Sequence, residues 1–432
     1  MKLTLPLSRN YSFFQTSFFI IALGTRCTQL AIAWWVLSAT GSPALFAKFI
    51  AYASLAEVIA QPVLGSLGDQ FNRPSLVIVA NLLSVWSVVM LLIVCRLGAF
   101  HGYLLAALMV LLSIASGIRK PLESSMLPML VDKHKLADAF RIKAMMHSIA
   151  ILVGPGLAGV LVTYWGIKVA FMVDVIAIVA ACGMMMQLNT SPPATRSKQT
   201  WIQYRRDWAA KTKAGMRALI QVKAEFYLAL LAMMINFALY PFFLILVPVL
   251  VKEYLHFPAW FIGVMDISFG IGILVASAFV VQRVNQWCHR HQAIFIGFIL
   301  LAMALLATAT VHFAWFLPIF MVLGGIGLML VNINTSIVRS LATPEHYRNR
   351  MQAGVIFIST LANPIGSYAS SFALQSMGII ATILILGIIV LIASWFILFT
   401  PQIRTVMKQP TDKLENVYPV LYPQAFTDSS QE

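Results

Sequence analysis

Charged side chains are scarce in this sequence. Aspartate, glutamate, lysine and arginine make up 10% of its 432 residues, whereas a soluble domain carries about 25%. Hydrophobic residues make up 60%. So few charged side chains cannot cover the surface of soluble domains. The composition therefore excludes a soluble globular protein and predicts a chain that crosses a membrane many times.

Cysteines are also few, and motifs of common catalytic sites are missing. The spacing of the four cysteines fits neither a metal site nor a disulfide framework. The sequence has no His-Glu-x-x-His, no Gly-x-Ser-x-Gly and no Gly-x-x-x-x-Gly-Lys-Ser/Thr loop. We therefore expect no enzyme, no catalytic residue, no metal and no cofactor. Any pumping must be driven by an ion gradient rather than by ATP.

Long apolar segments account for most of the chain. A helix needs about 20 apolar residues to cross a bilayer. Twelve segments of this kind predict an all-α polytopic membrane protein with twelve transmembrane helices. They lie near residues 14–37, 44–66, 75–96, 102–118, 144–164, 168–188, 226–251, 260–281, 292–312, 314–338, 352–373 and 378–400.

The basic residues are distributed unevenly between the two sides of the membrane. If the N-terminus is cytoplasmic, 25 of the 30 lysines and arginines fall on the inner side and four on the outer side, with Arg26 inside the membrane. The positive-inside rule explains this distribution without a nucleic-acid partner. It predicts that both termini are cytoplasmic and that the basic residues face an anionic inner leaflet.

The polar stretches divide the chain. A basic stretch from Trp201 to Lys223 with interspersed aromatic residues predicts an amphipathic helix on the inner leaflet. The polar C-terminal tail, with its proline and serine, is expected to be poorly ordered. The predicted parts are an N-terminal bundle at 1–188, a cytoplasmic linker at 189–224, a C-terminal bundle at 225–400 and a cytoplasmic tail at 401–432.

The turn between the second and third segments reads Gly65-Ser-Leu-Gly-Asp-Gln-Phe-Asn-Arg73. It resembles the loop between helices 2 and 3 of the major facilitator superfamily, Gly-x-Leu-Ala/Gly-Asp-Arg-x-Gly-Arg-Arg/Lys, although Gln70 replaces the first arginine of that pattern. In the family this loop latches the two halves of the transporter at the cytoplasmic face. The resemblance therefore implies gating roles for Asp69 and Arg73.

Two further stretches resemble the bacterial drug and siderophore exporter branch of this family. Pro121 with Leu127-Pro-Met-Leu-Val131 matches the region between helices 4 and 5. Gly154-Pro155-Gly156-Leu-Ala158-Gly159 resembles the antiporter signature Gly-Pro-x-x-Gly-Gly, which implies gating roles for Gly154 and Pro155. Proline kinks a helix and small residues let a neighbour approach closely, so an ordinary packing face is the alternative.

The resemblance covers the chain up to about residue 400. It implies two six-helix bundles that rock about a substrate site midway between them, in the bacterial cytoplasmic membrane. An internal similarity supports two related halves. Pro155 and Pro364 lie 209 residues apart, and a polar loop precedes the helix around each of them.

Four charged residues lie within apolar segments, where a charge is expensive and usually functional. Arg26 and Glu57 have similar depth, so we expect them to face the central cavity and either pair or exchange partners. A structural ion pair is the alternative. Glu57 and Asp266 are the candidates for proton coupling, although Asp266 also suits a rim position reached by water. Arg26 keeps its charge and favours substrates with an anionic group. Asp174 resembles a structural acid of the branch.

Polar residues in later helices are candidates for the substrate cavity. Asn236 and Tyr240 lie near Pro241, where a proline-interrupted helix suits a binding wall or gate. A kinked packing helix is the alternative. The remaining candidates are Asn332, Asn334 and Asn363.

These observations predict a secondary active transporter that works as a monomer. Its expected activity is proton-coupled export of an amphipathic small molecule, either siderophore-like or drug-like. Uptake of a siderophore or metabolite is the alternative within transport, because the same rocking cycle runs in either direction. An intramembrane enzyme or sensor is the remote alternative.

Overall fold

All regular structure in the described part of the chain is helical. The computed structural model describes residues 9–65, 72–98, 100–131, 135–188, 213, 215–311, 313–409, 414–415 and 417–426. Asp69 and most of the predicted linker, residues 189–212 and 214, lie outside these ranges. The amphipathic helix predicted there therefore stays a prediction.

Within the described residues, eleven helices are long and apolar enough to cross a membrane. One of them, α14 (Glu345–Phe399), has 55 residues and would be roughly 80 Å long if straight, far more than the bilayer core of about 30 Å. Gly378 interrupts it with non-helical backbone angles, φ 77° and ψ 179°. Only glycine adopts this conformation readily, so α14 is two helices in sequence. When its two parts are counted separately, the described residues contain twelve helices of this kind, and the all-α polytopic prediction is confirmed.

The chain forms two compact units. Unit 1 comprises Met1–Ser197, Phe243–Ile267 and Ser367–Gln375, and unit 2 comprises Lys198–Phe242, Ser268–Gly366 and Ser376–Glu432. Unit 1 contains α1 (Arg9–Thr40), α2 (Pro43–Gly65), α3 (Arg73–Leu97), α4 (Gly102–Leu130), α5 (Leu136–Tyr164) and α6 (Ile167–Met186). It also contains the π-helix η3 (Phe242–Leu246) except for its first residue, the short α9 (Val247–Val249) and the π-helix η4 (Leu250–Tyr254). The first half of α10 (Trp260–Val275) belongs to it as well.

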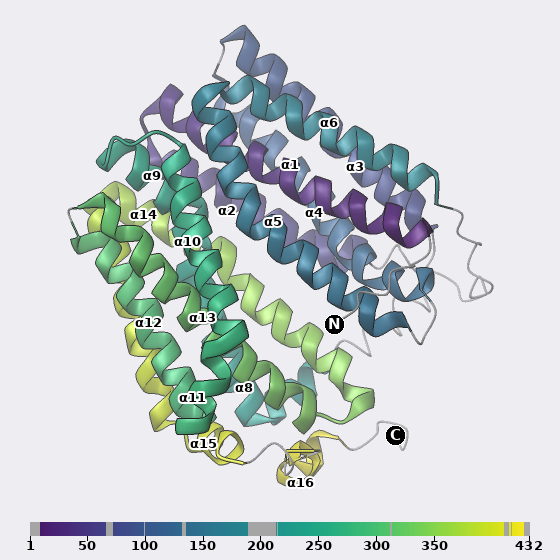
Figure 1. Ribbon diagram of the computed structural model, residues 1–432, viewed down its shortest axis with the longest axis vertical. Coiled ribbons are helices and arrows are strands. Elements are labelled where there is room, and N and C mark those ends of the chain that lie inside the picture. The colour runs from purple at the N-terminus through teal and green to yellow at the C-terminus, as the bar shows by residue number, and fades with distance from the viewer. Residues whose placement is uncertain are drawn as a thin grey trace. The chain divides into compact units, whose positions relative to one another are not determined.

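Helix α1 is the centre of unit 1. It packs against both α5 and α6, and Figure 1 shows it lying between them. Its buried positions combine large apolar side chains such as Phe14 and Ile21 with small ones such as Gly24. A Cβ at Gly24 would collide with the Asp174 side chain and approach the Cβ of Ala177 to 3.0 Å. Glycine at this position therefore lets α6 approach α1 closely.

The first half of α10 packs just as closely against α5. A Cβ at Gly263 would lie 2.7 Å from the Cα of Gly156, and a Cβ at Gly159 would lie 2.8 Å from the Cα of Trp260. The Trp260 backbone N–H also donates to Thr163 Oγ1 at 3.0 Å. Small residues thus bring two helix backbones together beside the proline of α5.

Unit 2 is built around the antiparallel pair α12 (Arg290–Thr310) and α13 (Leu317–Ala342), which lie side by side in Figure 1. A Cβ at Gly297 would lie 2.9 Å from Val331 Cγ2. The unit also contains α8 (Lys223–Pro241), η5 (Ala276–Val280), α11 (Val281–Trp287), α15 (Pro401–Met407), α16 (Val417–Leu421) and most of α14. The predicted interruption at Pro241 is present, because α8 ends there and a π-helix follows.

The described part of the tail is more ordered than the sequence predicts. Residues of α15 pack on α8, and Tyr418 on α16 is fully buried. The Tyr418 hydroxyl donates to Glu225 Oε2 at 2.9 Å, while the Arg339 guanidinium pairs with the other oxygen of the same carboxylate. The prediction of a poorly ordered tail is therefore wrong for these residues, which are buried and hydrogen-bonded.

Candidate functional site

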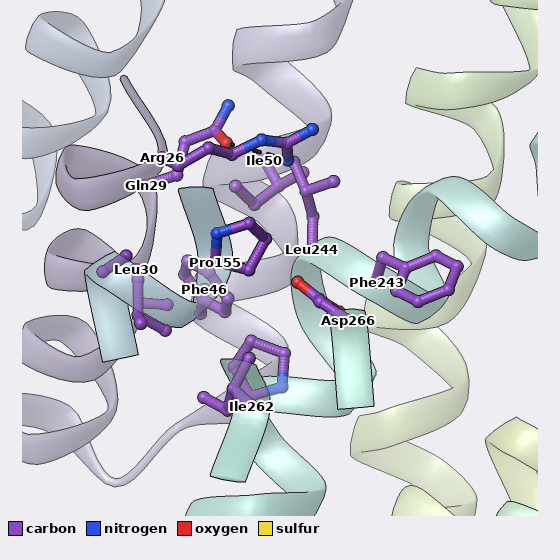
Figure 2. Close-up of a pocket in the computed structure, with 13 residues that line it drawn as sticks. Arg26, Gln29, Leu30, Phe46, Ile50, Pro155, Phe243, Leu244, Ile262 and Asp266 are labelled. Carbon is purple, nitrogen blue, oxygen red and sulfur yellow. Dashed lines mark hydrogen bonds between the residues drawn. The ribbon is translucent and has the colours of Figure 1, made fainter. Parts of the chain in front are cut away.

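A small pocket in unit 1 brings two charged membrane-embedded residues together. Arg26 comes from α1 and Asp266 from α10, and Pro155 of α5 lies on the wall that they share (Figure 2). The cavity encloses about 60 Å³. Its other lining residues, mostly apolar, are Gln29, Leu30, Ala33, Phe46, Ile50, Ala158, Phe243, Leu244, Pro248 and Ile262.

The position of Arg26 depends on a glycine of the neighbouring helix. A Cβ at Gly154 would come within 2.9 Å of Arg26 Cγ, so the absence of a side chain there leaves room for the arginine stem. The guanidinium Nη1 donates to Gln29 Oε1, one turn further along α1, at 3.3 Å. Figure 2 shows the Arg26 side chain extending across the upper side of the pocket. Gly154, which is predicted to act in gating, thus lies against Arg26, the predicted substrate-binding arginine. Pro155, its partner in the gating prediction, lines the same pocket as Arg26.

Asp266 supplies the opposite charge. Its Oδ1 is buried and makes no hydrogen bond within the described residues. Arg26 lines the same pocket, so a positive and a negative side chain share one cavity between membrane-spanning helices. Ionisable groups in such positions are usually functional.

The size of the pocket limits what this conformation can hold. The cavity measures about 60 Å³, whereas sites for drug-sized ligands measure about 300–1,000 Å³. The described pocket can therefore hold water, but a drug-sized substrate requires it to open.

Glu57 does not join Arg26. It forms an ion pair with Lys120 of α4 and accepts a hydrogen bond from Gln61 at 3.4 Å. A Cβ at Gly117 would lie 2.7 Å from the Cβ of Ala60, so α2 and α4 are close enough for Lys120 to meet Glu57. Of the two arrangements expected for Arg26 and Glu57, mutual pairing is absent from the described structure.

The other predicted cavity residues lie in unit 2. Asn236 and Tyr240 are half-buried on α8, and Asn363 on α14 has a buried Oδ1 without a hydrogen bond in the described residues. Asn332 is exposed on α13, while the buried Asn334 donates to the Leu330 carbonyl of its own helix at 2.8 Å. None of these five lines the pocket of unit 1, and their roles in substrate binding stay predictions.

The described part of the predicted gating loop is anchored within unit 1. Arg73, at the start of α3, donates through Nη1 to the Ser125 carbonyl at 2.9 Å and contacts Met129 Sδ at 2.9 Å. Both partners lie in the last turns of α4. This arginine therefore ties the start of α3 to the end of α4, and its latching role stays a prediction.

Sequence reasoning missed two charged residues. The predicted segment 102–118 ends before Arg119, but α4 continues through Pro121 and buries the arginine, which donates to Asn81 Oδ1 and Ser84 Oγ of α3. Lys252 likewise falls just outside the predicted segment 226–251. Lys252 Nζ donates to the Trp34 carbonyl at 3.0 Å and to Ser38 Oγ at 2.5 Å, and lies 5.2 Å from the Trp34 ring centroid. The burial of Arg119 could have been predicted only if the full length of α4 had been known.

Many membrane-spanning helices, with charged residues from separate helices lining one pocket, are typical of a polytopic transporter. The chain belongs to the Major Facilitator Superfamily, whose sequence model matches residues 16–342. It is similar to macrolide efflux protein A of Streptococcus pyogenes, with 21% identity over 366 residues covering 84% of this chain and 89% of the relative. The protein of the same name from Enterococcus faecalis is 23% identical over 216 residues, which cover 50% of this chain and 65% of the relative.

Solved structures of transporters share the fold. A peptide transporter POT in complex with sulfate superposes with a TM-score of 0.73 at 14% identity, covering 95% of this chain and 97% of the other. The nucleoside transporter NupG gives a TM-score of 0.64 at 14% identity, with 91% and 100% covered. Identities this low show a common fold only. The chain is thus a multi-pass membrane transporter of a bacterial transporter family.

Proposed function

We propose that this protein is a proton-coupled exporter of amphipathic small molecules in the bacterial cytoplasmic membrane. Family membership and the efflux function printed in the names of its relatives support export. The sequence has no Gly-x-x-x-x-Gly-Lys-Ser/Thr loop, so the gradient of an ion is the proposed source of energy. The uneven distribution of basic residues supports an orientation with both termini cytoplasmic.

The pocket shared by Arg26 and Asp266 is the observation that carries the proposal. Protons are carried across membranes by ionisable side chains inside the bilayer, and Asp266 is a buried carboxylate without a hydrogen bond to Oδ1 in the described residues. An inward proton gradient drives export only if the proton and the substrate are bound alternately. In the proposed cycle a proton on Asp266 and a substrate in the pocket shared with Arg26 therefore exclude one another.

This exchange links substrate to proton. Arg26 stays charged in both states, so it can pair with either the carboxylate of Asp266 or an anionic group of the substrate. The same pocket thus serves substrate and proton in turn. Because the cavity is smaller than a site for a drug-sized molecule, it must open to admit substrate, and this opening also gives water access to Asp266.

The substrate class rests on two indications. The relatives are named for macrolide efflux, which favours a large amphipathic molecule. Arg26 in the pocket favours a molecule with a carboxylate or a similar anion, as in carboxylate-type siderophores. A macrolide and a carboxylate siderophore are therefore the two substrates to compare.

The test is accumulation of each labelled substrate in inverted membrane vesicles with an imposed pH gradient. We expect D266N to lose accumulation driven by the gradient while it still exchanges labelled for unlabelled substrate without a gradient. The exchange shows that the variant folds and binds. E253Q, which neutralises an exposed acid of the same part of unit 1, is the matched control and should accumulate normally. Accumulation by D266N equal to that of the unmodified protein would refute the coupling role, and accumulation only in right-side-out vesicles would indicate uptake.

A further inference from the structure

A second cavity lies in unit 2, at the turn between α11 and α12. It is an open cavity of about 810 Å³, a volume within the range of sites for small molecules. Its walls come from α11, from the start of α12, from α13 and from the segment after α15. No residue of the proposed transport site takes part in it.

The lining of this cavity is basic. His289, Arg290 and Lys408 all line it, and its described lining contains no carboxylate. Arg290 Nη1 donates to the Gln409 carbonyl at 2.9 Å, which fixes the segment after α15 beside the start of α12. Helix α12 begins at Arg290, so the positive end of its dipole lies at the same place. The cavity is therefore suited to an anion.

Part of the remaining lining is apolar. Val281, Ile333, Ile337 and Met407 contribute apolar surface. Asn285 also lines the cavity, and its buried Oδ1 makes no hydrogen bond within the described residues. A ligand that matches all three features carries an anionic group, a hydroxyl that donates to Asn285, and an apolar part.

The position of the cavity in the membrane indicates where such a ligand comes from. It lies where the spans Trp260–Trp287 and Arg290–Thr310 meet. Trp287, beside the lining residues Gln286 and Cys288, is 87% exposed, as is typical of an aromatic anchor at the membrane interface. In the proposed orientation this end faces the cytoplasmic leaflet, which is rich in anionic lipid.

We propose that this cavity binds the phosphate group of an anionic phospholipid, with a phosphoglycerol headgroup as the best match. Arg290 and Lys408 hold the phosphate, Asn285 accepts a hydrogen bond from a glycerol hydroxyl, and the apolar wall covers the first carbons of an acyl chain. The lipid then bridges α11, α12 and the segment after α15. The site is separate from substrate transport and does not depend on the transport direction.

Native mass spectrometry of the purified full-length protein tests this proposal with phosphatidylglycerol, phosphatidic acid and phosphatidylcholine as probes. We expect phosphatidylglycerol to bind more tightly than phosphatidylcholine. K408Q should weaken phosphatidylglycerol about fivefold, as expected for one basic residue near a lipid phosphate. R283Q removes an exposed base of α11 that does not line the cavity and should have no effect.

Two further measurements identify the ligand. N285L should weaken phosphatidylglycerol but leave phosphatidic acid unchanged, since the latter has no glycerol hydroxyl to donate. Displacement of the lipid by millimolar inorganic phosphate would support the phosphate site and assign it to a free anion. Equal weakening by K408Q and R283Q would overturn the proposal, because binding would then follow net charge rather than the cavity.

Discussion

Single residues in this protein differ in function according to what surrounds them. Glu57 and Asp266 are both acids within membrane-spanning helices, and both were candidates for proton coupling on sequence grounds. Glu57, whose side chain is 17% exposed, pairs with Lys120, whose side chain is 60% exposed, so only the lysine side of this ion pair is open. Asp266 lies in the small pocket with Arg26. We therefore expect different roles for two chemically similar groups.

This difference predicts that E57Q keeps gradient-driven transport. An ion pair with an exposed lysine contributes about 0–1 kcal/mol, so its loss should change the transport rate by no more than roughly fivefold. The measurement is accumulation in inverted vesicles at a series of imposed pH gradients. K120Q, which breaks the same pair from the other side, should behave alike. Loss of the gradient dependence in E57Q alone would return the proton-carrying role to Glu57.

At the scale of helices, packing depends on a few glycines. The first half of α10 contacts α5 where a Cβ at Gly263 would lie 2.7 Å from the Cα of Gly156 and 3.0 Å from the Pro155 carbonyl oxygen. Backbone atoms cannot move aside as a flexible side chain can. The contact also positions Asp266 one turn after Gly263, so packing and the proposed coupling site depend on each other.

We therefore predict that G263A destabilises the protein by about 1–3 kcal/mol, the usual cost of overpacking a well-packed contact. The control is G183A on α6, an exposed position where a Cβ would meet no atom within 4 Å. That substitution should be neutral or slightly stabilising, because alanine favours a helix more than glycine does. Thermal unfolding of the two purified variants in detergent measures both effects. Similar unfolding temperatures would show that α5 and α10 separate at little cost.

The tail element provides a pH-dependent test. Burial first, and the negative charge of Glu225 second, raise the pKa of Tyr418 well above its usual value of 10.0. A raised pKa in the folded protein means that the stabilising contribution is present below about pH 10 and is lost as the pH rises through the folded-state value. The unfolding temperature should therefore fall at alkaline pH.

Y418F should lower stability at pH 7 by about 1.5–3 kcal/mol, because it removes a hydrogen bond to a charged group. It should also flatten the alkaline part of the stability curve. Y254F, at an exposed tyrosine, is the matched control and should keep the slope. Unfolding followed from pH 7 to 11 measures the difference between the variants. An unchanged slope in Y418F would mean that the tail detaches before the tyrosine ionises.

At the scale of the whole molecule, the sequence predicted what depends on local composition. The twelve crossings follow from apolar segments, and each can be identified without its neighbours. The partners of the charged residues could not be predicted, because they depend on helix rotation and on how far each helix extends. Helix α4 passes through Pro121 to Leu130, and this extension carries Lys120 to Glu57 and Arg119 into the core. The burial of Tyr418 likewise depends on a contact 193 residues away in sequence.

Membrane topology is the property of the whole chain that is most open to direct measurement. Tyr103, the second residue of α4, is 97% exposed, and Glu415 in the tail is also exposed. If α14 crosses the membrane twice, nine crossings separate these residues and they lie on opposite sides; if it crosses once, eight separate them and they lie on the same side. The interruption at Gly378 predicts nine.

We expect a membrane-impermeant maleimide to label Y103C in right-side-out vesicles and E415C only in inverted ones. The background should carry C95S and C288S, because these two cysteines are partly exposed, while Cys27 and Cys182 are buried. Labelling of both positions from one side would mean that α14 makes a single crossing despite Gly378. Labelling on opposite sides but in the reverse sense would keep the twelve crossings and place the termini outside, against the distribution of basic residues. The two introduced cysteines thus test two properties separately. Whether the two positions are labelled from different sides gives the number of crossings between them. The side from which each position is labelled gives the orientation of the chain.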